Sequence, residues 1–265
     1  MATYPASGHW PALHALVDQV AERQRADFGQ LASTVKPDGS LVTDCDRWSD
    51  ATIAAGLAAI LPEDGLLSEE GCTDAPSQRH GWIVDPLDGT TNFSVGLPIW
   101  AISMARLQDG QPLEAIIDVP PLHERYVAVR GQGVWRNGEP LKPPGGPRHR
   151  CNCASLCTRS LPVLQKVPQR FPAKTRMLGV ASLNLLGVGL GTMLAALEAT
   201  PKIWDLAAVW LILEELGCVI RPLADAPFPM TAGAALGEAS YPLLAACDEE
   251  HYQRFLPWGE ALVSC

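Results

Sequence analysis

Two aspartates, Asp85 and Asp88, stand three positions apart at the end of an apolar run. The apolar residues 82–84 predict the end of a buried strand. Gly89 then allows a tight turn, and the polar residues 90–92 can cap a short helix whose free N–H groups point back at the two carboxylates. Carboxylates bind Mg²⁺ and helix N-termini bind anions, so this stretch predicts a site for divalent cations and a phosphate.

Further carboxylates stand at the ends of other predicted elements. They are the pair Asp44 and Asp46 before a helix, the pair Glu69 and Glu70 after a short strand, and Asp205 at the start of a later helix. Adjacent acidic residues often form a solvated turn, and an aspartate at a helix start is a good N-cap. Taken alone, these carboxylates fit both an ordinary structural role and metal binding.

The nine residues from Asp85 to Phe93, Asp-Pro-Leu-Asp-Gly-Thr-Thr-Asn-Phe, match the signature of the inositol monophosphatase family without a mismatch. The chain therefore resembles this family of Mg²⁺-dependent, lithium-sensitive phosphatases, from Lys36 to the last helix. The resemblance implies the fold of inositol monophosphatase and fructose-1,6-bisphosphatase, a five-layer α-β-α-β-α sandwich with an α+β and an α/β part. It also implies a homodimer.

The resemblance implies a set of metal ligands. Glu69, Asp85 and Asp88 would bind the first Mg²⁺ region, together with the backbone carbonyl of Leu87. Asp205 lies in a Trp-Asp-Leu-Ala-Ala block that resembles the family's second-metal block, so it would bind a second ion together with Asp88. Two or three Mg²⁺ ions per site are expected.

The resemblance also implies which residues activate water. Asp46 completes a Val-Thr-x-x-Asp pattern that the family brings next to the threonine of its Asp-Gly-Thr run, which is Thr90 here. This pair would orient the attacking water and accept its proton, and Glu69 would help to hold that water. The N–H groups of Gly89 and Thr90 would hold the phosphate.

Substrate contacts are implied for Asp88, Gly89, Thr90, Gly179, Ala181 and Glu198. The last of these stands seven residues before Asp205, where inositol-processing members have a glutamate that contacts sugar hydroxyls. The chain departs from the family at Val180, where a Ser or Thr is usual, at Leu194, where many members have Asp, and at Ser68, which replaces a Gly. The first two departures fall on sugar contacts and leave the substrate open.

The elements that would position these residues follow from apolar spacing. The first half is predicted to hold helices over 10–32 and 47–61 and a meander of strands over 99–107, 113–119, 125–130 and 133–135. The second half is predicted to alternate strands (152–157, 176–180, near 219, 243–247) with helices (from 161, 182–197, 205–216, from 249). The Pro- and Gly-rich stretch 143–147 places a domain boundary between residues 1–145 and 146–265.

Composition bounds the class of protein. The 265 residues are 47% hydrophobic and 18% charged, which is typical of a globular protein. The formal net charge of −9 argues against nucleic acid or an anionic membrane as the main partner. No apolar run is long enough to span a bilayer and no signal peptide is evident, so a cytoplasmic location is expected.

The cysteines and histidines form no recognised motif. The eight cysteines include one cluster, Cys151, Cys153 and Cys157, which lacks an evident fourth ligand and a Cys-x-x-Cys pair. We interpret these as reduced core cysteines on a strand. The six histidines have no motif neighbours and are interpreted as surface or core residues.

The leading hypothesis is an Mg²⁺-dependent phosphomonoester hydrolase, an inositol-monophosphate phosphatase that works by in-line attack of a metal-activated water. Alternatives in the same superfamily are a histidinol-phosphate phosphatase, a fructose-1,6-bisphosphatase and a phosphoadenosine phosphatase. A different class is a regulatory partner of the transcription machinery. The expected ligand is a small phosphorylated sugar or polyol.

Overall fold

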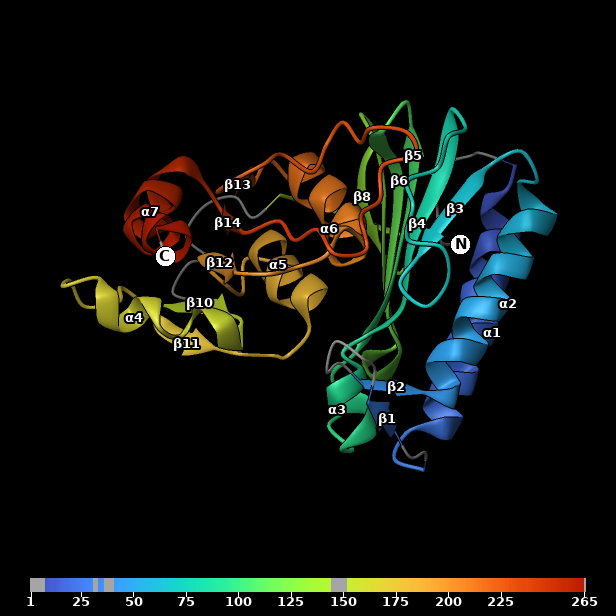
Figure 1. Cartoon of the computed structure of the whole chain (residues 1–265), viewed down its shortest axis with the longest axis horizontal. Coiled ribbons are helices and arrows are strands. Elements are labelled where there is room, and N and C mark those ends of the chain that lie inside the picture. Colours follow the sequence, from blue (N-terminus) through green and yellow to red (C-terminus); the bar gives the residue numbers. More distant parts are fainter. Residues whose placement is uncertain (1–7, 31–32, 36–40, 144–151, 265) are drawn as a thin grey trace.

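The computed structural model of the chain describes residues 8–30, 33–35, 41–143 and 152–264. Their helices and strands form five layers, which follow one another across Figure 1: two long helices, a large sheet, two inner helices, a smaller sheet and outer helices. The α-β-α-β-α sandwich predicted from the sequence is confirmed.

The first layer consists of α1 (Trp10–Asp27) and α2 (Asp44–Ile60), which pack against each other. α2 begins after Thr43, whose hydroxyl accepts hydrogen bonds from the N–H groups of Cys45 and Asp46. The buried side chains of α1 recur at helical spacing and join the core under the large sheet: Leu13, Leu16, Val17 and Val20.

The second layer is a seven-stranded sheet with the order β3-β4-β5-β6-β7-β8-β9. β3 and β4 are parallel, and the other neighbours are antiparallel. The strands are β3 (Gly65–Ser68), β4 (His80–Asp88), β5 (Ala101–Gln108), β6 (Gln111–Val119), β7 (Glu124–Val129), β8 (Gly133–Arg136) and β9 (Glu139–Leu141). β4, which carries both aspartates of the central run, is held on both sides and is buried over residues 81–88.

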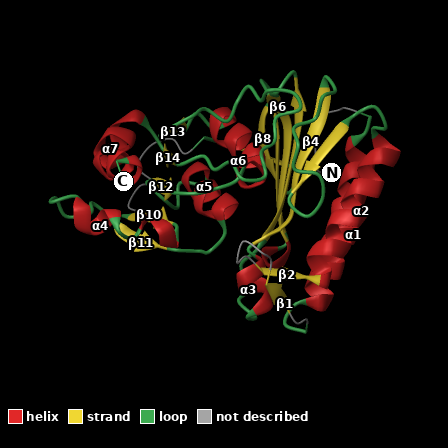
Figure 2. Cartoon of the chain, viewed as in Figure 1, coloured by secondary structure: helices red, strands yellow, loops and turns green. Residues whose placement is uncertain are grey.

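The third layer consists of α5 (Ala181–Gly189) and α6 (Ile203–Glu215), which lie between the two sheets (Figure 2). α6 packs on the large sheet and also against α5. Almost all of its side chains are buried, as expected of a helix that is apolar all round.

The fourth layer is a five-stranded sheet with the order β11-β10-β12-β14-β13. β10 is parallel to β11 and β12, whereas β14 is antiparallel to β12 and β13. The strands are β10 (Cys153–Leu156), β11 (Lys174–Arg176), β12 (Ala195–Glu198), β13 (Val219–Pro222) and β14 (Leu243–Ala246).

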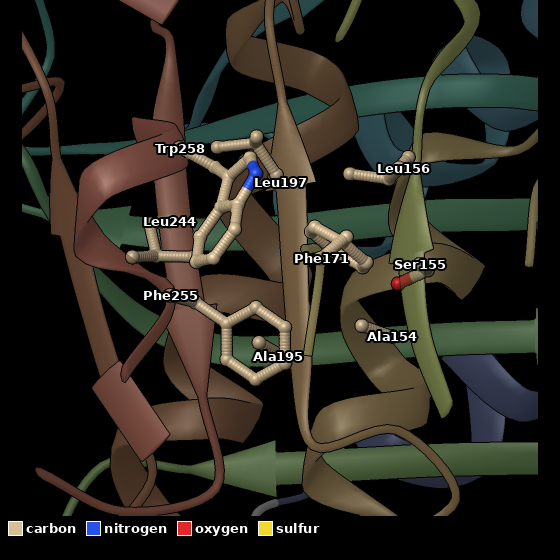
Figure 3. A pocket seen from close by; sticks show the side chains of 9 residues that line it. All are labelled: Ala154, Ser155, Leu156, Phe171, Ala195, Leu197, Leu244, Phe255 and Trp258. Atoms are coloured by element: carbon tan, nitrogen blue, oxygen red, sulfur yellow. The ribbon is translucent and has the colours of Figure 1, made fainter. Parts of the chain in front are cut away.

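The fifth layer consists of α4 (Val163–Lys166) and α7 (Glu249–Val263), which contact each other. Figure 3 shows Phe255 and Trp258 of α7 over the sheet, close to Phe171. These side chains and their apolar neighbours leave no room for a water molecule between helix and sheet. This face is therefore packed core and not a ligand cavity.

Short elements complete the fold. β1 (Ser33–Val35) and β2 (Leu41–Thr43) form a two-stranded sheet. α3 (Thr90–Ser94) follows β4, and two 3₁₀ turns are η1 (Pro120–Leu122) and η2 (Thr158–Ser160). None of the helices among the described residues is long and apolar enough to cross a bilayer.

Two predicted elements of the second half are wrong. The helix predicted over 182–197 is two elements, because α5 ends at Gly189 and β12 begins at Ala195. Gly191, with φ +68°, lies between them in a left-handed conformation that suits the end of a helix. The strand predicted over 176–180 ends at Arg176, and residues 177–180 form a loop. Periodicity alone does not separate a short buried strand from a helix in an apolar run.

The predicted domain boundary falls on residues 143–147, of which 144–147 lie outside the described residues. The division into residues 1–145 and 146–265 therefore stays a prediction. One continuous cluster of buried apolar side chains contains residues of both parts, among them Ile83, Leu197 and Leu206. The two parts thus share a core.

Candidate active site

The turn between β4 and α3 carries the central run. The pairing of β4 with β5 shifts between Asp85 and Asp88, which lets both aspartates leave the regular alternation of the strand. The Asp85 carboxylate accepts a hydrogen bond from the N–H of Leu87 (2.9 Å), and the Asp88 carboxylate accepts one from the N–H of Ser182 at the start of α5 (2.8 Å). Asp88 thus joins the large sheet to the inner helices.

Gly89 is the N-cap of α3 and has φ +103°. A Cβ at this position would lie 2.7 Å from the Val180 side chain and 3.1 Å from the Ile99 carbonyl, so both conformation and space require glycine. The expectation that residues 90–92 cap α3 is wrong, because no side chain bonds to the helix start. Thr90 is the first helical residue, and its hydroxyl donates a hydrogen bond to Asp46 instead.

Three carboxylates converge on one volume. Oxygen atoms of Asp85, Asp88 and Asp205 all lie within 4.8 Å of one another. Asp205 stands in the first turn of α6 and accepts a hydrogen bond from the N–H of Lys202 (2.7 Å), so it caps its helix while facing the other two.

Burial and mutual repulsion perturb these groups. Burial raises the pKa of Asp85 well above its ordinary value, and the nearby charges of Glu69, Asp88 and Asp205 raise it further. Burial and the charge of Asp88 likewise raise the pKa of Asp205 well above its ordinary value. Burial also raises the pKa of Asp88, against the opposing effect of its bonds to Ser182. Bound cations would compensate the charge of such a cluster and favour its ionised form, and its hard oxygen donors fit Mg²⁺.

Glu69 follows β3, one residue past the Ser68–Val84 pair of the parallel ladder, and its N–H donates to the Val84 carbonyl (3.1 Å). It therefore stands beside Asp85. Ser68, which replaces the usual glycine, is accommodated because residue 71 is a glycine: a Cβ there would lie 2.6 Å from the Ser68 hydroxyl.

Asp46 and Thr90 lie within hydrogen-bond distance, as predicted from the sequence. The Thr90 hydroxyl donates to Asp46 Oδ1 (2.7 Å) and lies 3.2 Å from the carbonyl of Leu87, the predicted backbone ligand. Asp46 Oδ2 accepts from the N–H of Thr43 (2.9 Å) and also from its hydroxyl. Asp46 is buried and fixed from both sides, whereas Asp44 is exposed and pairs with Arg47.

Glu198 ends β12 and is buried. Its Oε1 accepts from Asn184 Nδ2 (2.7 Å), and the Asn184 side-chain oxygen accepts from the Leu178 N–H (3.2 Å). Burial, together with the charge of Asp88, raises the pKa of Glu198 to about 8. Burial disfavours the charged form of this carboxyl, so a hydrogen bond from a substrate hydroxyl or the charge of a cation would stabilise it.

The predicted substrate wall lies beside the central run. Gly179 has φ +72°, and a Cβ there would lie 3.0 Å from Asn92 Oδ1. Ala181 begins α5, and Val180 is buried against Gly89. Leu194 is also buried, so the position where many family members have a carboxylate is part of the core here.

Sequence reasoning missed two asparagines that position this wall. Asn184 connects Glu198 to Leu178, and Asn92 donates to the carbonyls of Ile99 (2.9 Å) and Leu178 (2.7 Å). The one available signal was a polar amide in an otherwise apolar stretch, which applies to Asn184. Cys153 lies on β10 and Cys157 follows it, whereas Cys151 is outside the described residues.

Comparison with known proteins matches residues 12–253 to the inositol monophosphatase family, and the chain belongs to that family. The histidinol-phosphatase of Mycobacterium tuberculosis is 32% identical over 220 residues, covering 77% of this chain and 83% of that protein. The inositol-1-monophosphatase of Mesorhizobium japonicum is 33% identical over 208 residues, covering 72% and 76%. A putative Nus factor SuhB of Neisseria meningitidis is 32% identical over 219 residues, covering 78% and 82%. These relationships support phosphomonoester hydrolysis.

Solved structures show the same fold. The IMPase of Thermotoga maritima has a TM-score of 0.78 at 23% identity, covering 94% of this chain and 96% of that one. An IMPase/NADP phosphatase, solved in complex with Mg²⁺ and phosphate, has a TM-score of 0.76 at 24% identity, covering 96% and 94%. At this level of identity the likeness concerns the fold alone.

Proposed function

We propose that this chain is an Mg²⁺-dependent phosphomonoester hydrolase that acts on a small polyol phosphate, with inositol monophosphate as the leading substrate. The observation that carries the proposal is the convergence of the buried Asp85 and Asp88 and the half-buried Asp205, together with the hydrogen-bonded pair of Thr90 and Asp46. Glu69, the three aspartates and the Leu87 carbonyl would hold two or three ions. Bound Mg²⁺ would offset the charge of the phosphoryl oxygens and make water a stronger nucleophile.

The residues of the chain would position the reactants. The Thr90 hydroxyl donates a hydrogen bond to Asp46. The lone pairs of its oxygen therefore remain to accept a hydrogen bond from the attacking water. Glu69 would hold the same water from the β3 side. The N–H groups of Gly89 and Thr90, at the start of α3, would bind the phosphate oxygens.

Glu198 is the proposed polyol contact. If its carboxyl accepts hydrogen bonds from substrate hydroxyls, Glu198→Gln should raise KM for inositol phosphates by about tenfold, which corresponds to the loss of one hydrogen bond. The KM for an aryl phosphate, which has no such hydroxyls, should stay unchanged. Steady-state kinetics on both substrates measure this difference. The control is Glu215→Gln, which changes a glutamate that bonds the N–H groups of Gly131 and Gly133. An equal effect of Glu198→Gln on both substrates would remove Glu198 from the polyol site.

Histidinol phosphate is the second candidate. The M. tuberculosis relative is named a histidinol-phosphatase, and the buried carboxyl of Glu198 could pair with the ammonium group of such a substrate. Activity on a panel of histidinol, inositol, fructose-1,6-bis- and phosphoadenosine phosphates, with Mg²⁺ present or chelated, ranks these candidates directly.

The regulatory alternative is supported only by the names of relatives such as SuhB. A chain that binds transcription factors in a pulldown but hydrolyses no phosphomonoester would favour it.

A homodimer is proposed on the basis of an exposed apolar area. Val95, Leu97, Leu122 and Met177 are exposed. A groove of about 340 Å³ is lined by Leu122 and by Pro98, Ile99 and Leu178, which are sequence neighbours of the others. Apolar areas of this kind are typical of protein interfaces. Light scattering should give the mass of two chains, and Leu122→Glu should give one. The control, Val263→Glu, changes an exposed apolar residue at the end of α7 and should stay dimeric. A monomeric unmodified chain would refute this proposal.

A further inference from the structure

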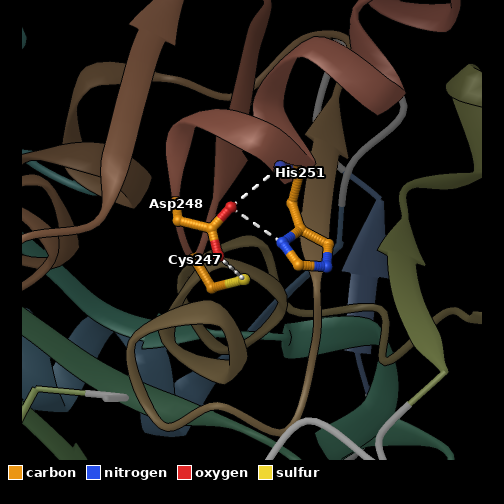
Figure 4. A group of neighbouring side chains, drawn as sticks. All are labelled: Cys247, Asp248 and His251. Carbon is orange, nitrogen blue, oxygen red and sulfur yellow. Dashed lines mark hydrogen bonds and ion pairs between the residues drawn. The ribbon is translucent and has the colours of Figure 1, made fainter. Parts of the chain in front are cut away.

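A second group of metal-binding side chains lies where β14 leads into α7. The ligand atoms of Cys247, Asp248 and His251 all lie within 4.8 Å of one another. Figure 4 shows the thiol and the imidazole on the same side of the Asp248 carboxylate. None of these residues belongs to the carboxylate site described above.

The contacts in this group exceed what a helix cap requires. Asp248 is the N-cap of α7, and its Oδ1 accepts from the His251 N–H (2.8 Å). The same oxygen lies 2.8 Å from Nδ1 of the His251 ring, and the Cys247 thiol donates to Oδ2 at 3.6 Å. The imidazole and the thiol therefore face the carboxylate in addition to the backbone bond that caps the helix.

The strand register brings a second thiol, that of Cys218, beside Cys247, although its sulfur is outside the group of ligand atoms that lie within 4.8 Å of one another. β13 pairs with β14 so that Val219 lies opposite Ala246, and the next residues along are Cys218 and Cys247. The N–H of Leu223 donates to the carbonyl of Pro242, and hydrogen-bonded pairs alternate from there along the ladder. The cysteines therefore form a non-hydrogen-bonded pair, in which opposed side chains share a face and approach most closely. Both are free cysteines.

We propose that this group and the neighbouring Cys218, which would move toward it as the ion binds, form a structural Zn²⁺ site with four ligands: Cys218, Cys247, Asp248 and His251. Two sulfurs, an imidazole and a carboxylate suit tetrahedral Zn²⁺, whereas the oxygen-only active site suits Mg²⁺. Each thiol would release its proton to solvent on becoming a ligand. The ion would join β13, an edge strand of the smaller sheet, to β14 and to the first turn of α7.

Cobalt substitution tests the site independently of phosphatase activity. The reduced full-length chain, kept in excess Mg²⁺ to fill the carboxylate site, should take up one equivalent of Co²⁺. It should then show the near-ultraviolet thiolate-to-cobalt charge-transfer band and the visible bands of a tetrahedral ion. Zn²⁺ should displace the cobalt, and elemental analysis after dialysis should find one Zn²⁺ per chain. The oxygen ligands of the active site produce no thiolate band.

Variants assign the ligands. Cys247→Ala and His251→Ala should each abolish the band or weaken Co²⁺ binding at least about tenfold, in the range expected when metal ligation is disturbed. Cys218→Ala should halve the band, because one of two thiolates is lost. Cys153→Ala, a cysteine on β10, is the control and should behave as the unmodified chain. Absence of a thiolate band in the unmodified chain, or its persistence unchanged in the His251 or Cys218 variant, would overturn the proposal. His251→Ala keeps the strands intact and so tests the site even if Cys247→Ala does not fold.

Discussion

Exhaustive removal of divalent cations should abolish phosphatase activity, and added Mg²⁺ should restore it. Oxygen atoms of Asp85, Asp88 and Asp205 lie within 4.8 Å of one another, and burial with mutual repulsion raises the pKa of Asp85 and Asp205, so bound cations should favour the ionised forms that act as ligands. A metal contributes several kcal/mol of charge stabilisation in the transition state, so its loss should cost at least about 10³-fold in kcat/KM. Turnover on an aryl phosphate, before and after chelation, measures this effect.

Variants separate the metal site from general electrostatics. Asp205→Asn should lower activity and raise the Mg²⁺ concentration needed for half-maximal rate. Asp109→Asn, at an exposed turn carboxylate, should change neither. Full turnover after complete metal removal would refute the proposed mechanism. Li⁺ inhibition is expected from family membership, and its absence would bear on that expectation alone.

The same carboxyls link the stability of the metal-free chain to pH. Burial raises the pKa of Asp85 and Asp205 in the folded chain, so the folded state binds these protons more tightly than the unfolded state. Their stabilising contribution is present at low pH and is lost as pH rises through the folded-state pKa values. In chelator, the melting temperature should therefore fall as pH rises above the ordinary aspartate range of about pH 4, and Mg²⁺ should raise it most at the upper end of the pH range. A shallower slope in Asp85→Asn would assign the effect to this cluster.

Much of this site could be predicted because its residues come in local patterns. The apolar run of β4, the turn at Gly89 and the capped start of α6 each lie within a few residues of the aspartate that they position. Asp46 and Thr90 are 44 positions apart, and only the family resemblance placed them together. The assigned roles of all these residues remain predictions until they are tested.

What the sequence could not predict depends on contacts between distant segments. Asn184 bonds to Glu198 only because α5 turns back beside β12, a turn hidden inside an apolar run that was interpreted as one helix. The pairing of Cys218 with Cys247 depends on the register of two strands that are separated by 20 residues, residues 223–242. Cys247, Asp248 and His251 lie within five residues of one another, and only Cys218 is brought to them by the fold. Periodicity identifies faces and elements, but it does not specify register.

The last expected result concerns the pair that would orient the water. Thr90→Ala removes the hydroxyl between Asp46 and the expected water position, and should lower kcat by about 10²-fold or more, the usual worth of a positioned acid–base group. KM and the Mg²⁺ requirement should change little, because the metal carboxylates are untouched. Thr90→Ser keeps the hydroxyl and should retain most of the activity. Thr91→Ala, at the exposed neighbouring position, is the matched control.

Asp46→Asn tests the direction of the hydrogen bond. One side of Asp46 must accept from the Thr43 N–H, so the amide oxygen of an asparagine should stay there and its NH₂ group should face Thr90. The Thr90 hydroxyl would then accept a hydrogen bond from the asparagine NH₂ group, and its own proton would point toward the attacking water. It could no longer accept a hydrogen bond from that water in the orientation that the mechanism needs. We expect a loss in kcat like that of Thr90→Ala, and a double variant little worse than either, since the two act as one unit.

Stability measurements distinguish this role from a purely structural one. Thr90→Ala leaves Asp46 Oδ1 without the donor found here, which should cost about 1–3 kcal/mol of unfolding free energy even if the pair has no part in catalysis. Asp44→Asn, an exposed aspartate in the same first turn of α2, is the control and should change neither melting temperature nor kcat. If Thr90→Ala melts earlier but turns over normally, the hydrogen bond only fixes the start of α2 to α3. Thr90→Ala and Asp46→Asn should each lose more kcat than the fraction of unfolded protein accounts for. That result would show that the pair orients the attacking water.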